Sequence, residues 1–251
     1  STSGNSGIMK KDYNFGYTKV NPKQKTKLVQ NVFSSVAPNY DIMNDLMSLG
    51  MHRLWKKRFV EIIDVKQNDV ILDVGSGSGD IAKEIIKSKL SNNFYLLDLN
   101  KEMLEEGKKR LKNEKNLKYI IGNAEKLNFE KNFFDKYIIS FCLRNVTEYL
   151  LSIKEAYRVL KPGGKYCCLE FSTPKSSLIS SSYKIYKSKI LPLLGEVIAK
   201  DKNAYKYLSE SIDLFPSQNE LSKYLIESGF EQVESINLFN GIVAIHIGYK
   251  I

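Results

Sequence analysis

Residues 70–80 read VILDVGSGSGD, and this stretch decides the fold. Its first five residues are mostly apolar and β-branched, which is typical of a buried parallel strand. Gly75, Gly77 and Gly79 then follow in alternation. Glycine lets backbone N–H groups approach a ligand closely at the start of the next helix. The stretch therefore predicts a strand, a glycine loop and a helix that bind a nucleotide-type ligand.

The glycine spacing separates two ligands of this type. A dinucleotide loop has its third glycine three residues after the second, but here Asp80 holds that position. S-adenosylmethionine (SAM) has a nucleoside and no pyrophosphate, so the GxGxG loop fits it better. Residues 93–98 form a second expected strand, and its last residue, Asp98, is placed to accept both ribose hydroxyls. We therefore predict a SAM site, with a dehydrogenase as the less favoured alternative.

Beyond these two strands, apolar strand-like runs alternate with amphipathic helices, which indicates a doubly wound parallel α/β sheet. Further strands are expected at 117–121, 134–141 and 165–171, helices at 101–111, 149–160 and 217–228, and a terminal hairpin at 231–238 and 241–249. Asn123 and Ala124 follow the third strand, where side-chain and backbone groups can read an adenine.

Composition limits the possible partners. The 251 residues are 43% hydrophobic, enough for one core, and no apolar run is long enough to cross a bilayer. The net charge of +10 fits RNA, an anionic membrane surface or a lysine-rich exterior. We expect one domain over residues 26–251, preceded by a disordered or leader segment over 1–25. The three cysteines, two of them adjacent, favour a reducing compartment.

Two helical segments are expected outside the alternation. Residues 26–63 carry methionines at every fourth position, 43, 47 and 51, and we expect a lid over the carboxyl edge of the sheet, although such a stripe also fits a core. Residues 173–216 are apolar, aromatic and basic at helical spacing. This insert is a candidate substrate wall, a dimer face or a helix resting on a membrane.

Motifs along most of the chain give a specific resemblance. They are VFSSVAPNYDIMNDLMSLGMHRLWK, ILDVGSGSGD, DLNKEMLEEG, GNAEKLNF, SFCLRNVTE, RVLKPGGKYCCLEFSTP, YLSESIDLFP and GIVAIHIG. Together they resemble the SAM-dependent C-methyltransferases of ubiquinone and menaquinone biosynthesis, the UbiE family. Two departures are Ser78 in place of the usual threonine and Cys142 in place of the usual glycine, which should narrow the backbone near the substrate.

The resemblance implies a Rossmann-like, seven-stranded class I methyltransferase sheet, mostly parallel with its last strand antiparallel. It implies SAM as cofactor, no metal, and methyl transfer to a ring carbon of a polyprenyl methoxy-benzoquinol or a demethylmenaquinol. The SAM contacts it implies are Ser78, Asp98, Asn123, Ala124 and Ser140, and we expect Tyr40, Gly75, Gly77 and Gly79 to bind the cofactor with them. It assigns the chemistry to Arg144 and Asn145.

The reaction itself suggests further roles. A ring carbon becomes nucleophilic only when a ring hydroxyl loses its proton, so the enzyme must stabilise a phenolate. Arg144 can do this by charge-assisted hydrogen bonds, but a guanidinium stays protonated and is a poor base. A water held by Arg144 and Asp41 could accept the proton. His52 is the nearest imidazole to the family-specific front motif, and we favour a structural role for it.

Alternatives and location complete these expectations. An RNA methyltransferase would suit the positive charge, but the sequence has no Asn-Pro-Pro-Tyr loop after the fourth strand. A catalytically silent quinone-binding scaffold is a second alternative. We expect a prenylated quinol substrate and no nucleic acid, with peripheral membrane contact, a biosynthetic complex or a homodimer as partners. The expected location is the matrix face of the mitochondrial inner membrane in a eukaryote, or the bacterial cytoplasm.

Overall fold

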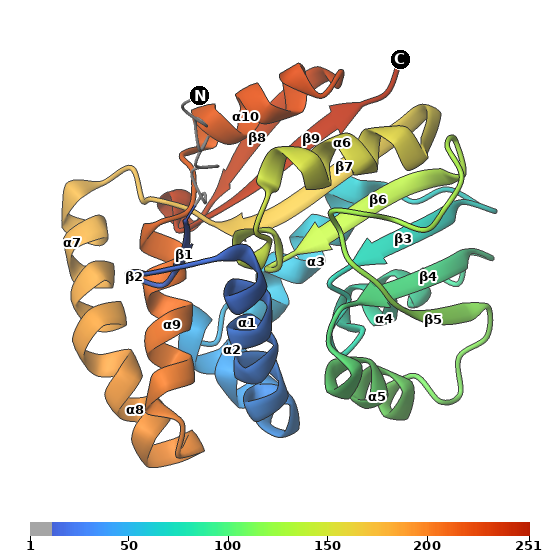
Figure 1. Cartoon of the computed structure of the whole chain (residues 1–251). Coiled ribbons are helices and arrows are strands. Elements are labelled where there is room, and N and C mark those ends of the chain that lie inside the picture. The colour runs from blue at the N-terminus through green and yellow to red at the C-terminus, as the bar shows by residue number, and fades with distance from the viewer. Residues whose placement is uncertain (1–11) are drawn as a thin grey trace, which may run out of the picture.

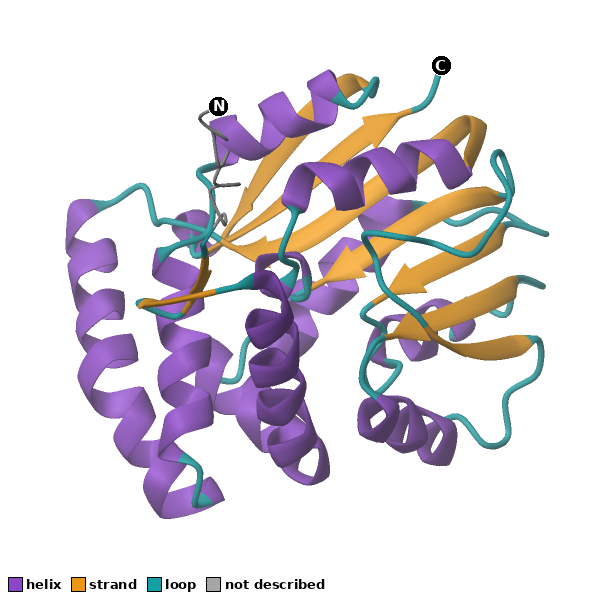
Figure 2. Ribbon diagram, in the orientation of Figure 1, coloured by secondary structure: helices purple, strands orange, loops and turns teal. Residues whose placement is uncertain are grey.

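The computed structural model describes residues 12–251 and shows a seven-stranded sheet with helices on both faces (Figure 1, Figure 2). From edge to edge the strands are β5 (Leu117–Ile121), β4 (Asn93–Asp98), β3 (Val70–Val74), β6 (Phe134–Ser140), β7 (Leu160–Phe171), β9 (Val243–Tyr249) and β8 (Glu231–Leu238). The first five pair in parallel, and β9 is antiparallel to both of its neighbours. This confirms the predicted fold class.

Side chains alternate between the two faces of each strand and so feed two cores. In β3, Ile71 packs into one core and Leu72 into the other, and both are fully buried. The first core includes residues of α3 (His52–Ile63) and α4 (Asp80–Ile86). The second includes residues of α6 (Tyr149–Val159) and α10 (Gln218–Glu227). Helix α5 (Lys101–Arg110) lies beside β4 and β5.

The N-terminal boundary differs from the expectation. Residues 12–25 are folded: β1 (Tyr13–Phe15) and β2 (Thr18–Val20) form an antiparallel hairpin, and α1 (Pro22–Val36) begins directly after it. Asn21 caps α1 with a capping box, which explains the early start of the helix. The structure therefore contradicts the expected disorder for residues 12–25. Residues 1–11 lie outside the described residues.

The expected lid consists of α1, a 3₁₀ turn (Ala37–Asn39) and α2 (Tyr40–Ser48), with α3 continuing under the sheet. Only part of it covers the carboxyl edge. Met43 and Met47 of the methionine stripe are buried in the first core. The stripe is thus core, as its alternative interpretation held, and α1 supplies the covering face.

The expected insert is helical, with α7 (Ser177–Ile185), a π turn (Tyr186–Ile190), α8 (Leu191–Ala199) and α9 (Lys202–Asp213). In Figure 1 these helices stand beside the sheet, next to α1 and α2. Over residues 12–251, none of the helices has the length and apolar character that a membrane span requires.

One strand begins earlier than predicted. β7 starts at Leu160, not Lys165, and the additional residues are accommodated by a register shift against β6. Gly163 has φ +83, a value that glycine adopts readily. The predicted hairpin between β8 and β9 is present.

Candidate active site

A cavity opens at the carboxyl edge of β3, β4 and β6 and is roofed by α1. It holds about 750 Å³ of unfilled space, part of it open to solvent. Its lining includes Tyr40, Gly75, Gly77, Asp98, Asn123, Ala124 and Asn145, seven of the residues expected at the site. Five segments far apart in sequence therefore meet at the edge where ligands bind in open α/β sheets.

Asp98 ends β4 and lies against the glycine loop. Its Oδ2 accepts the backbone N–H of Gly77 at 2.9 Å, and its Oδ1 accepts that of Asn100 at 2.9 Å. Burial raises the pKa of Asp98 to about 6, and these two backbone donors oppose the shift. The carboxyl is therefore mostly ionised at pH 7. Each oxygen keeps a lone pair for a further donor such as a ribose hydroxyl.

Asn100, which was not among the predicted residues, links helix α1 to the end of β4. Its Nδ2 donates to the side-chain oxygen of Gln30 at 2.9 Å and to Ser34 Oγ at 2.9 Å, both on α1. Its Oδ1 caps α5 by accepting the N–H of Met103. The sequence signal was present, because asparagine directly before an amphipathic helix is typical of an N-cap. That signal does not reveal the second partner on α1.

Neighbouring side chains pack closely against Gly75 and Gly77 of the loop. A Cβ on Gly77, which has φ +55, would lie 3.1 Å from Met103 Cε and 3.4 Å from the Tyr40 hydroxyl. A Cβ on Gly75 would lie 2.2 Å from Cys142 Sγ. Cys142 thus occupies the space in front of the loop, which agrees with the expected narrowing. The glycine loop, the carboxylate of Asp98 and the adjoining apolar wall of the cavity fit a nucleoside that carries a sulfonium.

Three expected SAM contacts do not reach the cavity lining. Ser78 is buried, and its hydroxyl accepts a hydrogen bond from Arg110. Gly79 caps α4 at φ +78, where a Cβ would meet Leu111. Ser140 Oγ is buried and has no hydrogen-bond partner within the described residues. Ser78 and Gly79 therefore shape the loop from behind.

Asn123 and Asn145 lie at the ends of the β5 and β6 segments, on the cavity wall. The side-chain oxygen of Asn123 accepts the N–H of Glu125 at 2.9 Å, so this amide closes its own turn. Asn145 Oδ1 accepts the hydroxyl of Tyr207 at 2.8 Å. Asn145 Nδ2 is buried and has no partner in the part of the chain that the structure describes. Asn145, a lining residue, therefore carries one unsatisfied amide donor that is buried beside the cavity.

Arg144 lies beneath this wall and is not part of the lining. It is 4% exposed, and Nη1 donates to Glu170 Oε1 at 2.8 Å and to the carbonyl of Phe141 at 3.2 Å. Nε donates to Ser211 at 3.1 Å. The structure thus gives the guanidinium protein partners directly after β6, on β7 and on α9. It holds the turn that carries Asn145, instead of facing the cavity as the sequence analysis expected.

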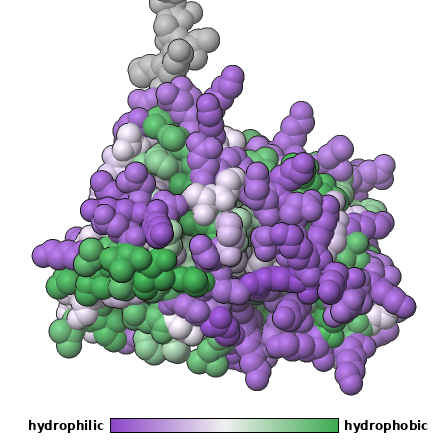
Figure 3. All heavy atoms as spheres, turned by 90° about the horizontal axis from the view of Figure 1, so that it is seen from below, coloured by the Kyte–Doolittle hydropathy of each residue, from purple (hydrophilic) through white to green (hydrophobic). Residues whose placement is uncertain are grey.

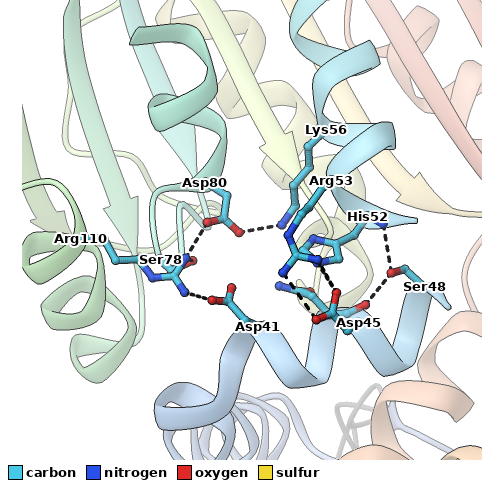
Figure 4. Close-up of polar contacts among 10 residues, drawn as sticks. Asp41, Asp45, Ser48, His52, Arg53, Lys56, Ser78, Asp80 and Arg110 are labelled. Atoms are coloured by element: carbon cyan, nitrogen blue, oxygen red, sulfur yellow. Dashed lines mark hydrogen bonds and ion pairs between the residues drawn. The ribbon is translucent and has the colours of Figure 1, made fainter. Parts of the chain in front are cut away.

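Asp41 also lies away from the cavity. Figure 4 shows it paired with Arg110, which in turn binds Asp80 at 2.9 Å. Lys56 binds the other oxygen of Asp80 at 2.7 Å. This network joins α2, α3, α4 and α5 below the glycine loop. The structure does not bring Asp41 and Arg144 together, so the expected shared water between them is not retained.

His52 has the structural role that we favoured. It is buried, its Nε2 lies 3.0 Å from Asp45 Oδ1, and its backbone N–H donates to Ser48 Oγ (Figure 4). Burial lowers its pKa, with Lys56 and Arg53 acting in the same direction. His52 is therefore neutral at pH 7 and fixes the α2–α3 corner.

The insert does not supply the expected wall. None of the lining residues that the structure describes belongs to residues 173–216. The insert reaches the site indirectly, through Tyr207 of α9 and its bond to Asn145. Residues of α1 such as Val29 and Phe33, which were not predicted, form the apolar wall.

The sheet order, the glycine loop and the acid at the end of β4 define a class I SAM-dependent methyltransferase. Two solved structures share the fold. A SAM-dependent methyltransferase from Aquifex aeolicus has a TM-score of 0.61 and 16% identity over 84% of this chain and 98% of its own. Phosphoethanolamine N-methyltransferase 2 of Haemonchus contortus, in complex with SAM, has a TM-score of 0.60 and 18% identity over 78% of this chain and 52% of its own.

Residues 19–250 match the ubiE/COQ5 methyltransferase family, and the chain belongs to it. The ubiquinone/menaquinone biosynthesis C-methyltransferase of Rickettsia prowazekii is 51% identical over 95% of this chain and 98% of its own length. That of Rickettsia bellii is 50% identical over the same shares. The protein is a SAM-dependent C-methyltransferase of quinone biosynthesis, and its substrate is a prenylated quinol.

Proposed function

We propose that the cavity under α1 holds SAM and the quinol ring together, and that the ring is a polyprenyl methoxy-benzoquinol, a demethylmenaquinol or both. The observation that supports this is the meeting of the glycine loop, Asp98 and an unsatisfied amide donor on one wall. In this arrangement Asp98 accepts the ribose hydroxyls of SAM. Asn123 and Ala124 contact the adenine, and Tyr40, Gly75 and Gly77 bound the remainder.

Asn145 is the residue that we assign to the ring. A quinol oxygen that loses its proton becomes an acceptor, and Asn145 Nδ2 is a donor without a partner among the described residues. SAM, when bound, would supply the methyl group: a ring hydroxyl loses its proton to water, the ring carbon forms the new bond as the sulfur–methyl bond breaks to leave S-adenosylhomocysteine, and the ring carbon then loses its proton to water. A donor that meets the phenolate oxygen stabilises the charge that makes this carbon nucleophilic. Arg144 and Glu170 contribute by fixing the turn beneath Asn145.

The test is an assay of the purified protein with SAM and short-tailed benzoquinol and naphthoquinol analogues, read by mass spectrometry of the product. We expect a gain of one methyl group on a ring carbon of at least one analogue. An Asp98→Ala variant should lose SAM affinity. Absence of methyl transfer to both analogues, or salt-sensitive retention of RNA with methylation of that RNA, would contradict the proposal.

We also propose that the protein works on the surface of the membrane that holds its substrate, from the cytoplasmic side in a bacterium or the matrix side in a mitochondrion. The support is an apolar face on the insert, formed by Leu178, Ile185, Ile190, Leu193, Val197 and Ile198. All six are exposed, Val197 to 69%. Figure 3 shows hydrophobic side chains gathered on the side where α7 and α8 lie. Exposed Lys184, Lys189 and Lys200 flank them and would attract anionic headgroups.

Vesicle flotation tests this surface. Binding to vesicles containing anionic lipid should be lost in a Leu193→Ser/Val197→Ser variant, while an Ile226→Ser control on α10, also exposed, should bind normally. A tailed quinol carrying a photo-crosslinker should label residues 173–216. Equal binding by both variants would contradict the proposal. So would a homodimer in solution that buries this face and is broken by the same substitutions.

A further inference from the structure

One hydrogen bond joins the insert over residues 173–216 to the wall of the cavity. Tyr207 of α9 is 3% exposed, and its hydroxyl donates to Asn145 Oδ1 at 2.8 Å. It is the contact that brings α9 to an amide of the cavity lining, although α9 itself supplies no lining residue that the structure describes. Tyr207 opens the YLSESIDLFP motif, but the motif alone does not show that it contacts Asn145.

The contact determines which end of the amide remains available. A carboxamide has an oxygen acceptor on one side and an NH₂ donor on the other. Because Tyr207 occupies the oxygen, the nitrogen is turned the opposite way, and it is the atom without a partner among the described residues. If the amide rotated by half a turn, its oxygen would take the place of this unpartnered nitrogen.

The tyrosine ring is itself held in place from the other side. Phe15 of β1 stacks on it, with ring centroids 4.4 Å apart and planes inclined by 11°. The hairpin that carries Phe15 is anchored at two points. Tyr13 binds Glu148, three residues beyond Asn145, and Tyr17 donates to Asp213 at the end of α9 at 2.6 Å. The hairpin therefore ties α9 to the turn that follows β6.

The tyrosine keeps its proton under all ordinary conditions. Burial raises the pKa of Tyr207 well above its usual range, and the charge of Arg144 opposes this only in part. A protonated hydroxyl is the form that can donate to an amide oxygen. The Tyr207 hydroxyl therefore stays protonated and able to donate to Asn145.

We propose that Tyr207, braced by Phe15, is a positioning residue that holds the Asn145 amide with its NH₂ group turned toward the quinol oxygen. This inference rests on the proposed role of Asn145 as the donor to the ring. Tyr207 does not touch substrate in this arrangement; it acts through Asn145. Its contribution therefore exists only while Asn145 is present.

The first test compares two tyrosines of the same helix. Tyr207→Phe removes the hydroxyl bonded to Asn145, and Tyr205→Phe removes a buried hydroxyl that has no hydrogen-bond partner within the described residues. We expect kcat for a short-tailed quinol to fall roughly 10-fold in Tyr207→Phe, as for loss of one orienting hydrogen bond. The dissociation constant for SAM should be unchanged. Tyr205→Phe should retain wild-type kcat.

The second test is a double-mutant cycle, which a merely structural role would not satisfy. Asn145→Ala should lower kcat on the order of 100-fold. The double variant Tyr207→Phe/Asn145→Ala should have the same kcat as Asn145→Ala alone, because the tyrosine then has nothing to position. Losses that multiply in the double variant would overturn the inference, and so would a Tyr207→Phe variant with wild-type kcat.

These outcomes are distinct from failure of the proposed function. A wild-type protein that methylates neither quinol contradicts the assignment of the site, and the inference falls with it. A wild-type protein that is active, with an Asn145→Ala variant that is impaired and a Tyr207→Phe variant that is not, contradicts the positioning role alone.

Discussion

The Arg144 guanidinium and the Glu170 carboxylate lie 2.8 Å apart, and both side chains are almost completely buried. Removing one member of such a pair leaves the other charged and desolvated. We therefore expect Arg144→Ala to lower the free energy of unfolding by roughly 3–5 kcal/mol. Denaturant unfolding followed by circular dichroism measures this loss.

The matched control is Arg58→Ala, which breaks an exposed pair with Glu61 one helical turn away. It should cost less than about 1 kcal/mol. If Arg144→Ala kept wild-type stability but lost turnover, the guanidinium would have to act on the substrate, contrary to the contacts described above.

SAM binding should depend on the charge of Asp98. Its folded-state pKa is about 6, so the carboxylate form that accepts two ribose hydroxyls is depleted as the pH falls below 6. Calorimetric titration should show a weaker SAM affinity at pH 5 than at pH 7.5. Asp98→Asn should bind SAM on the order of 10- to 100-fold more weakly at pH 7.5 and show little of this pH dependence. An Asp64→Asn control, exposed on the surface, should match the wild type.

Asp73 should make the ligand-free protein less stable as the pH rises. Burial, reinforced by the charges of Asp98 and Asp80, raises its pKa to about 8. Because the pKa of Asp73 is higher in the folded than in the unfolded protein, protonation of Asp73 favours the folded state. This contribution to folding stability is complete below about pH 4 and is lost as the pH rises through 8. Within this window the free energy of unfolding should fall by up to about 1.4 kcal/mol per pH unit from this group.

The measurement is the difference between wild type and Asp73→Asn, which keeps the shape and removes the titration. Their unfolding free energies should converge or cross between pH 5 and pH 8. A constant difference across this range would show that Asp73 does not titrate there.

The glycine loop gives a steric prediction. Gly75→Ala places a methyl group 2.2 Å from Cys142 Sγ at a residue with φ +65. We expect it to abolish measurable SAM binding. Cys142→Gly in the same chain should restore part of the affinity, because it removes the collision and leaves only the backbone strain. No recovery in the double variant would show that the strain alone is decisive.

The sheet was predictable because its signals are local. β-branched runs, the Gly75–Gly79 alternation and the carboxylate of Asp98 each belong to one short stretch, and their order along the chain gives the topology. The cavity residues next to those strand ends followed from the same logic. The family resemblance added Tyr40 and Asn145, which line the cavity.

What could not be predicted depends on contacts between distant segments. Arg144 precedes Asn145 by one residue, yet its partner Glu170 on β7 turns it away from the cavity. Asp41 is drawn to Arg110, a residue 69 positions later. The hairpin before α1 lies in a polar, lysine-rich stretch that resembles a leader, and its order comes from partners such as Glu148 and Tyr207. Periodicity in one segment does not reveal such partners.

The hairpin over Tyr13–Val20 has a consequence for trimming the chain. A truncated protein that begins at Pro22 would keep every strand of the main sheet. Among the helices, only α1 would lose its N-cap residue, Asn21. We expect it to fold and to bind SAM, while its catalytic rate drops to that of Tyr207→Phe. The hairpin would then be needed to hold Tyr207 and Asn145 in position, although it lies far from both in sequence.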